Sequence, residues 1–207
     1  MVRHYPISLN LKNKQVVIVG GGFIAERKLR KLLEAEADIT VISPEINAGI
    51  QRFVTEGQVK WKKKCFSEED LSKAFLIVAA TNVQHVNRQV SEACNEQQLI
   101  NIVDDPARSN FIVPSTLRRG KLVISVSTGG ASPGLAKKIV AELSREYDDS
   151  YDAYLEFLTD CRTKIQEEIT DLTVRKEVFQ KLLDPAFLRL TKEGSLKERE
   201  VLFRQLL

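Results

Sequence analysis

The stretch Val16-Val17-Ile18-Val19-Gly20-Gly21-Gly22-Phe23-Ile24-Ala25 joins four β-branched residues to three glycines and then to a helical pattern. Such a continuous apolar run predicts a strand that is buried on both faces. Gly20 can adopt the positive φ of a tight strand-to-helix turn, and Gly22 lets a pyrophosphate approach the N-terminus of the following helix. Ala25 completes the G-x-G-x-x-G/A fingerprint, which predicts nucleotide binding. A glycine-rich turn in another α/β protein is the alternative.

Apolar spacing extends the pattern on both sides of this stretch. Residues 25–33 place apolar side chains on one helical face, and further helices are predicted around 46–54 and 86–94. Residues 67–70 match a capping box that begins a short helix. An edge strand is predicted at 6–11, and further strands at 39–42, 59–65, 75–80 and 99–103. The repeated order predicts an α/β protein with a Rossmann-like doubly wound parallel sheet in residues 1–113.

Composition limits the classes of protein to which the chain can belong. Its 207 residues are 43% hydrophobic and 29% charged, as in globular proteins. No apolar run approaches the roughly 20 residues of a membrane span, and the N-terminus lacks an apolar leader, so we expect a cytoplasmic protein without a membrane partner. The net charge of +3 does not indicate nucleic acid as a partner. The three cysteines lack metal spacing, and no metal site is predicted.

Several candidate ligand-binding residues follow predicted strands. Ligands bind outside the carboxyl ends of the strands in open parallel sheets. The glycine loop, Thr81 and the segment Ser43-Pro44-Glu45 all stand at such ends. Glu45 is the acid available to the ribose hydroxyls, and no arginine stands there for a 2′-phosphate. The pattern therefore favours NAD over NADP as the cofactor.

Asp104 and Asp105 directly follow the strand predicted at 99–103. Two carboxylates at a strand end can accept a proton, and shielding from water makes a carboxylate a better acceptor. They are the candidate catalytic residues. The alternative is that this Asp-Asp-Pro sequence only caps a turn.

The remainder of the chain predicts a different kind of structure. Residues 111–114 and 122–128 predict two strands joined by residues 118–121. Ser125 and Ser127 share one face of the second strand, which suits a polar ligand or a sheet shared between subunits. Gly129 and Gly130 then expose backbone N–H donors, and Ser132 and Pro133 begin a helix. Amphipathic helices follow, and they predict a helical domain over residues 148–207.

Motifs along the chain resemble those of a known family. In order they are Val19-Gly20-Gly21-Gly22-x-x-Ala25-Glu26-Arg27-Lys28, Ala79-Ala80-Thr81, Asn101-x-Val103-Asp104-x-Pro106, Phe111-x-x-Pro114-Ser115 and Ser127-x-Gly129-Gly130-x-Ser132-Pro133. From about residue 4 to residue 145 the chain resembles the precorrin-2 dehydrogenase module of sirohaem synthase. The large methyltransferase domain of the fused enzymes is absent, so the chain resembles the stand-alone form.

The resemblance implies a reaction and an assembly. Members of the family oxidise precorrin-2 to sirohydrochlorin with NAD as the hydride acceptor, in sirohaem biosynthesis, and some also insert ferrous iron. They are homodimers with an interlocked middle segment, which corresponds to residues 114–147. The key aspartate of the family falls on Asp104, and the adjoining Asp105 departs from the usual pattern, so the two residues can be confused with one another or share the role.

The resemblance also extends the set of candidate site residues. The cofactor-binding candidates are Gly20, Gly22, Phe23, Ile24, Ser43, Pro44, Glu45 and Thr81. The substrate-binding candidates are Ser125, Ser127, Thr128, Gly129 and Arg108, with Thr128 standing where the family has serine. The alternative function is a non-catalytic nucleotide-sensing regulatory module with a helical dimer appendage, which would not require Asp104.

Overall fold

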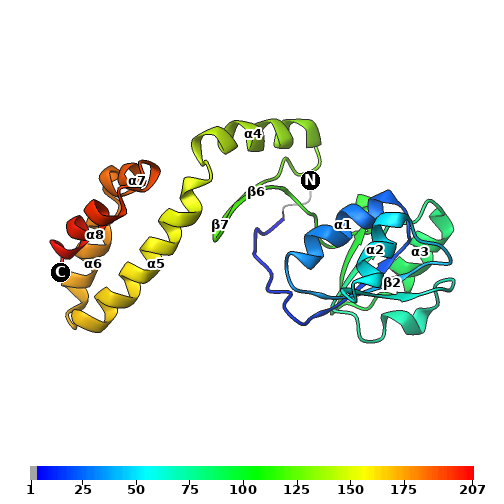
Figure 1. Ribbon diagram of the computed structural model, residues 1–207. Coiled ribbons are helices and arrows are strands. Elements are labelled where there is room, and N and C mark those ends of the chain that lie inside the picture. The colour runs from blue at the N-terminus through cyan, green and yellow to red at the C-terminus, as the bar shows by residue number, and fades with distance from the viewer. Residues whose placement is uncertain (1–3) are drawn as a thin grey trace. The chain divides into compact units, whose positions relative to one another are not determined.

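The computed structural model describes residues 4–207, which divide into two units (Figure 1). The first unit ends at Val113, and the second comprises residues from Pro114 to Leu207. None of the helices in residues 4–207 is long and apolar enough to cross a membrane.

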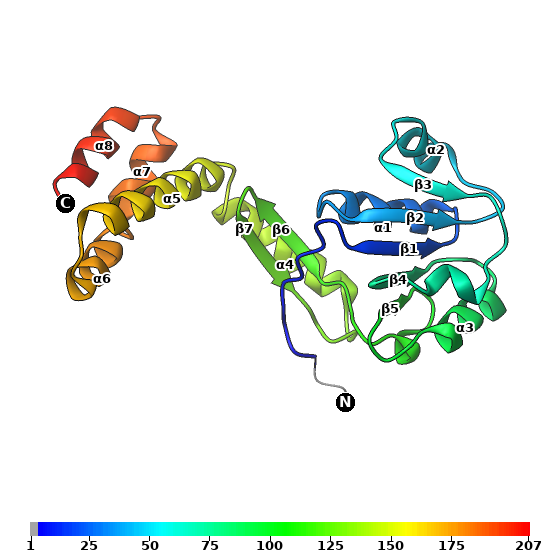
Figure 2. The same ribbon diagram turned by 90° about the horizontal axis from the view of Figure 1, so that it is seen from below.

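A five-stranded parallel sheet in the order β3-β2-β1-β4-β5 forms the centre of the first unit (Figure 2). The strands are β1 (Gln15–Val19), β2 (Asp38–Ile42), β3 (Val59–Lys62), β4 (Leu76–Ala79) and β5 (Leu99–Ile102). The predicted Rossmann-like sheet is therefore confirmed, and the run at 16–19 forms its central strand. Because every strand runs in the same direction, the loops that follow them meet at one edge of the sheet.

Helices cover both faces of this sheet. Helices α1 (Phe23–Leu33) and α2 (Ala48–Thr55) pack on one face, where Leu29 contacts the layer that contains Val16 and Ile18. The opposite face is covered by α3 (Gln84–Ala93) and the 3₁₀ helix η1 (Glu68–Leu71), and there Val90 lies in the layer of Val17 and Val19. This two-sided burial explains why the strands are apolar at consecutive positions.

Two predicted strands of the first unit differ from the structure. Residues 6–11 form no strand; residues 4–10 are exposed, and the turn that closes with a hydrogen bond from Lys14 N to Leu11 O leads into β1. The strand predicted at 59–65 ends at Lys62, because the Lys64 N–H bonds back to the Lys62 carbonyl and turns the chain. Alternating side chains alone do not supply the neighbouring backbone that a strand needs.

The second unit begins with an antiparallel hairpin of β6 (Ser115–Arg119) and β7 (Leu122–Val126). The strand predicted at 111–114 is wrong, and β6 starts at Ser115. Gly120, with a φ of +52°, and Lys121 form the turn, so the residues before them are paired rather than looped. Phe111 packs instead against the core of the first unit.

Helices complete the second unit. Helix α4 (Pro133–Glu146) packs on the hairpin, and its predicted N-cap is confirmed, since Ser132 Oγ accepts a hydrogen bond from Leu135 N at 3.2 Å. The remaining helices are α5 (Ser150–Glu168), α6 (Leu172–Lys181), α7 (Pro185–Lys192) and α8 (Leu196–Arg204). Their core contains Phe157, whose ring centroid lies 5.7 Å from that of Phe187 and 6.0 Å from that of Phe203.

The predicted capping box is present at the start of η1. Asp70 Oδ2 accepts a hydrogen bond from Ser67 N at 3.1 Å, and the Nζ atoms of Lys62 and Lys64 lie 3.0 and 2.8 Å from the carboxylate oxygens. The Asp70 side chain is 3% exposed. Burial acts to raise the pKa of Asp70, but the hydrogen bonds from Lys64, Lys62 and Ser67 outweigh it and hold the pKa below its usual value.

The Asp70→Asn variant is predicted to lose part of the pH dependence of stability. Because the pKa of Asp70 is lower in the folded than in the unfolded chain, its carboxylate adds stability above the unfolded pKa of about 3.9, and this stability is lost as the pH falls through the folded pKa. Urea unfolding at about pH 7 and about pH 3 measures the effect. The wild type should lose more unfolding free energy between the two conditions than the variant, and equal losses would contradict the assignment.

Candidate functional site

The glycine loop connects β1 to α1 at the carboxyl edge of the sheet. Gly20 has a φ of +122°, and a Cβ there would lie 2.4 Å from the Ala80 carbonyl oxygen. A Cβ on Gly21 would lie 1.9 Å from the Glu45 carbonyl oxygen. A Cβ on Gly22 would meet no atom within 4 Å. Packing thus requires the first two glycines, whereas Gly22 leaves space that the protein itself does not fill.

The first turn of α1 borders this space. Gly22 is the N-cap of α1, and no side chain accepts a hydrogen bond from the helix there. Uncapped N–H groups and the positive end of the helix dipole attract a pyrophosphate. Phe23 and Ile24 begin the helix, and Phe23 is 83% exposed. These apolar side chains are available to contact a bound dinucleotide.

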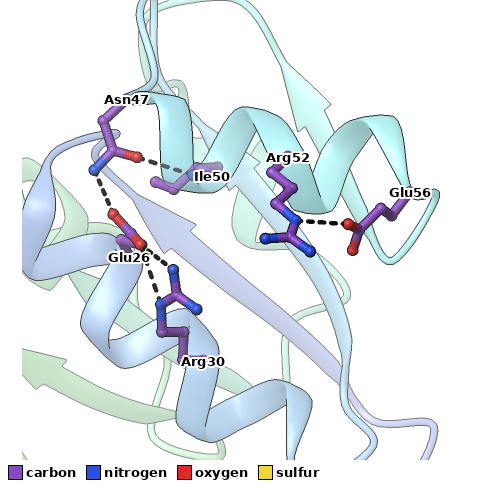
Figure 3. Close-up of polar contacts among 6 residues, drawn as sticks. All are labelled: Glu26, Arg30, Asn47, Ile50, Arg52 and Glu56. Carbon is purple, nitrogen blue, oxygen red and sulfur yellow. Dashed lines mark hydrogen bonds and ion pairs between the residues drawn. The ribbon is translucent and has the colours of Figure 1, made fainter.

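The loop after β2 is tied to the glycine loop. Asn47 N donates to Gly21 O at 2.8 Å. Figure 3 shows that the Asn47 side chain also contacts Glu26, with Nδ2 donating to Glu26 Oε2 at 2.7 Å. Glu26 also accepts a hydrogen bond from Arg30 Nε at 3.1 Å. The hydrogen bonds from Arg30, which has the larger effect, and from Asn47 lower the pKa of Glu26. Asn47 Oδ1 accepts from Ile50 N at 2.9 Å and so caps α2. Sequence reasoning missed Asn47, although an Asn three residues before a buried Ile is an N-cap signal.

Ser43, Pro44 and Glu45 therefore form a fixed wall beside the glycine loop. Ser43 is half-buried, and its carbonyl accepts a hydrogen bond from Trp61 Nε1 at 2.9 Å. Pro44 and Glu45 are exposed. Thr81 lies at the end of β4, next to the Ala80 carbonyl that Gly20 approaches. All the cofactor-binding candidates thus lie at one edge of the sheet in the first unit.

A pocket of about 140 Å³ opens beyond the ends of β4 and β5. It is lined by Gln84, Asn87, Arg88, Ile102, Asp104, Asp105 and Arg108. Both catalytic candidates and the substrate candidate Arg108 therefore share one pocket. The pocket also contains three polar residues that sequence reasoning missed, Gln84, Asn87 and Arg88.

The two aspartates have different partners. Asp105 Oδ1 accepts a hydrogen bond from Ala107 N at 3.2 Å and caps the 3₁₀ helix η2 (Pro106–Arg108). Its other oxygen lies 3.3 Å from Arg108 Nε. Asp104 Oδ1 instead accepts from Asn87 Nδ2 at 2.9 Å. The turn-cap alternative thus describes Asp105, and Asp104 is the carboxylate that is not needed by the turn.

The Asp104 side chain is not shielded from water within the first unit. It is exposed, and Asn87 donates a hydrogen bond to one of its carboxylate oxygens. A carboxylate in this position reaches the open side of the pocket. It can contact a ligand that enters there.

The other substrate candidates belong to the second unit. Ser125 is exposed and pairs across the hairpin with Thr116. Ser127 Oγ accepts from Gly129 N at 3.1 Å, and Thr128 Oγ1 accepts from Ser132 N at 3.1 Å. These hydroxyls organise a turn that leads into α4. They form a cluster within the second unit.

No group of three or more His, Cys, Asp or Glu side chains is placed to hold a metal ion within residues 4–207. The glycine loop and the adjacent polar pocket lie at the same edge of one sheet.

Comparisons with known proteins agree with this geometry. A family model described as "Putative NAD(P)-binding" matches residues 7–115. A precorrin-2 dehydrogenase of Priestia megaterium is 38% identical over 198 residues, which cover 96% of this chain and 96% of that protein. The solved structure of SirC, precorrin-2 dehydrogenase, has 36% sequence identity and a TM-score of 0.82, and the match covers 95% of this chain and 99% of that chain.

A longer relative matches with one part of its length. The siroheme synthase of Actinobacillus pleuropneumoniae serotype 7 (strain AP76) is 33% identical over 203 residues. The match covers 97% of this chain and 42% of the siroheme synthase. This chain therefore spans less than half the length of that relative.

The Gly22→Ala variant is predicted to fold normally but to bind NAD weakly. The backbone at Gly22 has a φ of −88°, which alanine adopts, and its Cβ would enter open space. The added methyl group would occupy the approach of the pyrophosphate and raise the Kd for NAD by about tenfold or more. Titration of the fluorescence of Trp61, which bonds to the Ser43 loop, measures the affinity.

Gly21→Ala is the contrasting variant. Its Cβ would collide with the Glu45 carbonyl, so both the thermal midpoint and NAD binding should fall. An unchanged Kd in Gly22→Ala would contradict the placement of the pyrophosphate.

Proposed function

Because this chain belongs to the precorrin-2 dehydrogenase family, we propose that it oxidises precorrin-2 to sirohydrochlorin with NAD as the hydride acceptor. The observation that carries the proposal is the position of Asp104, which lies in an open pocket at the same sheet edge as a dinucleotide loop. The relatives named precorrin-2 dehydrogenase are matched along nearly their whole length, which supports the same reaction for this chain.

The cofactor is held by residues of the first unit in this proposal. Gly20 and Gly22 let the pyrophosphate reach the N-terminus of α1. Phe23 and Ile24, in the first helical turn, contact the bound dinucleotide. The adenosine ribose is bound by Ser43, Pro44 and Glu45. The Glu45 carboxylate accepts hydrogen bonds from the ribose hydroxyls. Thr81, which follows β4, lines the same site. Bound NAD supplies a two-electron acceptor for a hydride.

Asp104 is the proton acceptor. Oxidation of the tetrapyrrole removes one hydrogen as a hydride and one as a proton, so the site needs a base beside the cofactor. Asp105 is occupied by the η2 cap and by Arg108, which makes Asp104 the better candidate of the two. Arg108 and Arg88 line the same pocket and carry the charge needed to pair with carboxylates of the substrate.

The hairpin of the second unit supplies substrate-binding groups in this proposal. Hydroxyl and N–H groups for the polar rim of a tetrapyrrole come from Ser125, Ser127, Thr128 and Gly129.

The second unit divides, in this proposal, into a dimerisation segment, residues 114–147, and a helical domain, residues 148–207. The three cysteines are free thiols, which fits a cytoplasmic enzyme in a reducing compartment.

Anaerobic turnover tests the proposed reaction. Purified protein is mixed with precorrin-2 and NAD, and the absorbance of sirohydrochlorin and of NADH is followed. We predict that Asp104→Asn lowers kcat by about 100-fold or more, since a positioned base contributes about that factor, while NAD binding is kept. Asp105→Asn is the matched control, because asparagine also caps a helix, and its kcat should stay within about threefold.

Two outcomes would contradict this assignment. NAD binding without any turnover by the wild type would overturn the proposed function. Full activity of Asp104→Asn together with an inactive Asp105→Asn would move the base to Asp105.

Addition of ferrous iron after sirohydrochlorin has formed tests the metal insertion that some family members carry out.

A homodimer joined through residues 114–147 is part of the proposal. A two-stranded hairpin is marginally stable alone, and here α4 covers one of its faces. Val123 on the hairpin and Leu135 on α4 are 42% and 49% exposed. A second copy of the chain would bury these apolar side chains and extend the sheet.

The double variant Val123→Glu/Leu135→Glu is predicted to weaken the dimer. Burial of two carboxylates at an interface is unfavourable, so the dissociation constant should rise by about 100-fold or more. Sedimentation equilibrium measures it. Leu172→Glu is the control, because Leu172 is exposed at the start of α6 and outside the proposed segment. A wild type that is monomeric at all concentrations would refute the proposed dimer.

A further inference from the structure

Asn87 has a buried side chain in the wall of the pocket that contains Asp104. It is 2% exposed, and its amide has a partner for every hydrogen-bonding position. Nδ2 donates to Asp104 Oδ1 at 2.9 Å and to Thr81 O at 3.1 Å. Oδ1 accepts from Thr81 Oγ1 at 2.8 Å and from Thr81 N at 3.2 Å. One side chain thus connects the end of β4 with the end of β5.

The network fixes which way the amide faces. The Thr81 N–H can only donate, so it requires Oδ1 of Asn87, and the Nδ2 group must then face Asp104. Rotation of the amide by half a turn would place an oxygen against the Asp104 carboxylate and an N–H group against the Thr81 N–H. The backbone of Thr81, which follows β4, is therefore enough to set the orientation, and the Asp104 carboxylate favours the same one.

The helix that carries Asn87 is itself fixed. The backbone N–H of Asn87 donates to Val83 O at 3.2 Å, at the start of α3. Val90, on the same side of α3, is fully buried in the core beneath the sheet. A donor held in this way can restrict the rotamer of an exposed aspartate, which has no other shielding in this unit.

We propose that Asn87 is the positioning residue for the reaction, an inference that rests on the proposed function of Asp104. Asn87 holds Oδ1 of Asp104, so that Oδ2 is presented to the substrate. Through Thr81 the same amide links the base to the cofactor side of the site. The pocket therefore aligns proton acceptor and hydride acceptor through a single buried side chain.

The test compares two variants of Asn87 with the wild type in the anaerobic assay. Asn87→Ala removes the donor to Asp104, and Asn87→Asp keeps the acceptor for Thr81 N while replacing the donor by a carboxylate oxygen. We expect kcat to fall by about 100-fold in both, because a base displaced by about 1 Å loses that factor. The KM for precorrin-2 and the Kd for NAD should stay within about threefold.

A matched control separates positioning from stability. Gln98 is also a buried amide, with Nε2 donating to Leu71 O at 2.6 Å and to Ala74 O at 2.9 Å, but it precedes β5 at the opposite end of the strand. Gln98→Ala should lower the thermal midpoint and leave kcat within about threefold. Loss of kcat in Gln98→Ala to the same extent as in Asn87→Ala would overturn the positioning role.

The exchange variant Asn87→Asp/Asp104→Asn provides the second test. It restores an amide–carboxylate pair, so its thermal midpoint should recover relative to Asn87→Asp, whereas kcat should stay low because the carboxylate stands at position 87. A wild type without turnover would overturn the proposed function and this inference with it. Wild-type turnover with an unchanged kcat in Asn87→Asp, or with a loss confined to NAD binding, would overturn the positioning role alone.

Discussion

The burial of β1 on both faces is the constraint on which the first unit depends. Val16 and Ile18 face α1, and Val17 and Val19 face α3, so the strand can occupy only the centre of the sheet. Because the neighbouring strands run parallel to β1, the loops that follow the strands all lie at the same edge of the sheet. At that edge the chain is so closely packed that Gly21 lies against the Glu45 carbonyl. The proposed cofactor site is thus a direct result of how the core is packed.

The pocket that contains Asp104 is lined by two aspartates and two arginines. Asp104 is exposed, so a dry environment does not control it in this unit. In the proposed mechanism, orientation by a buried amide takes the place of shielding, because hydrogen bonds to Thr81 hold the Asn87 side chain in one orientation. Asp105, one residue later, is engaged in the turn. Under this proposal one of the two adjacent carboxylates serves the structure and the other the reaction.

The sheet could be predicted from sequence because most of its strands are short, largely apolar runs, while β3 alternates apolar residues with lysines. Residues 6–11 and 111–114 were predicted wrongly because a pattern of side chains does not reveal whether a backbone partner lies alongside. Asp104 and the glycine loop are visible in the sequence, since motif and strand end coincide. Asn87 was missed because a polar residue on an amphipathic helix is usually solvated. Its position three residues before the buried Val90 was the available signal.

The open space at Gly22 has a consequence for how the protein handles its cofactor. The conformation of the loop is set by the close approach of Gly20 and Gly21 to neighbouring backbone atoms, and none of these contacts involves a ligand. A nicotinamide dinucleotide that accepts a hydride is consumed once per reaction cycle and must be exchanged for a fresh molecule. A preformed cradle without a closing side chain allows the spent carrier to diffuse away while the scaffold remains unchanged. The site therefore suits a cosubstrate that is released after each turnover, and not a permanently bound prosthetic group.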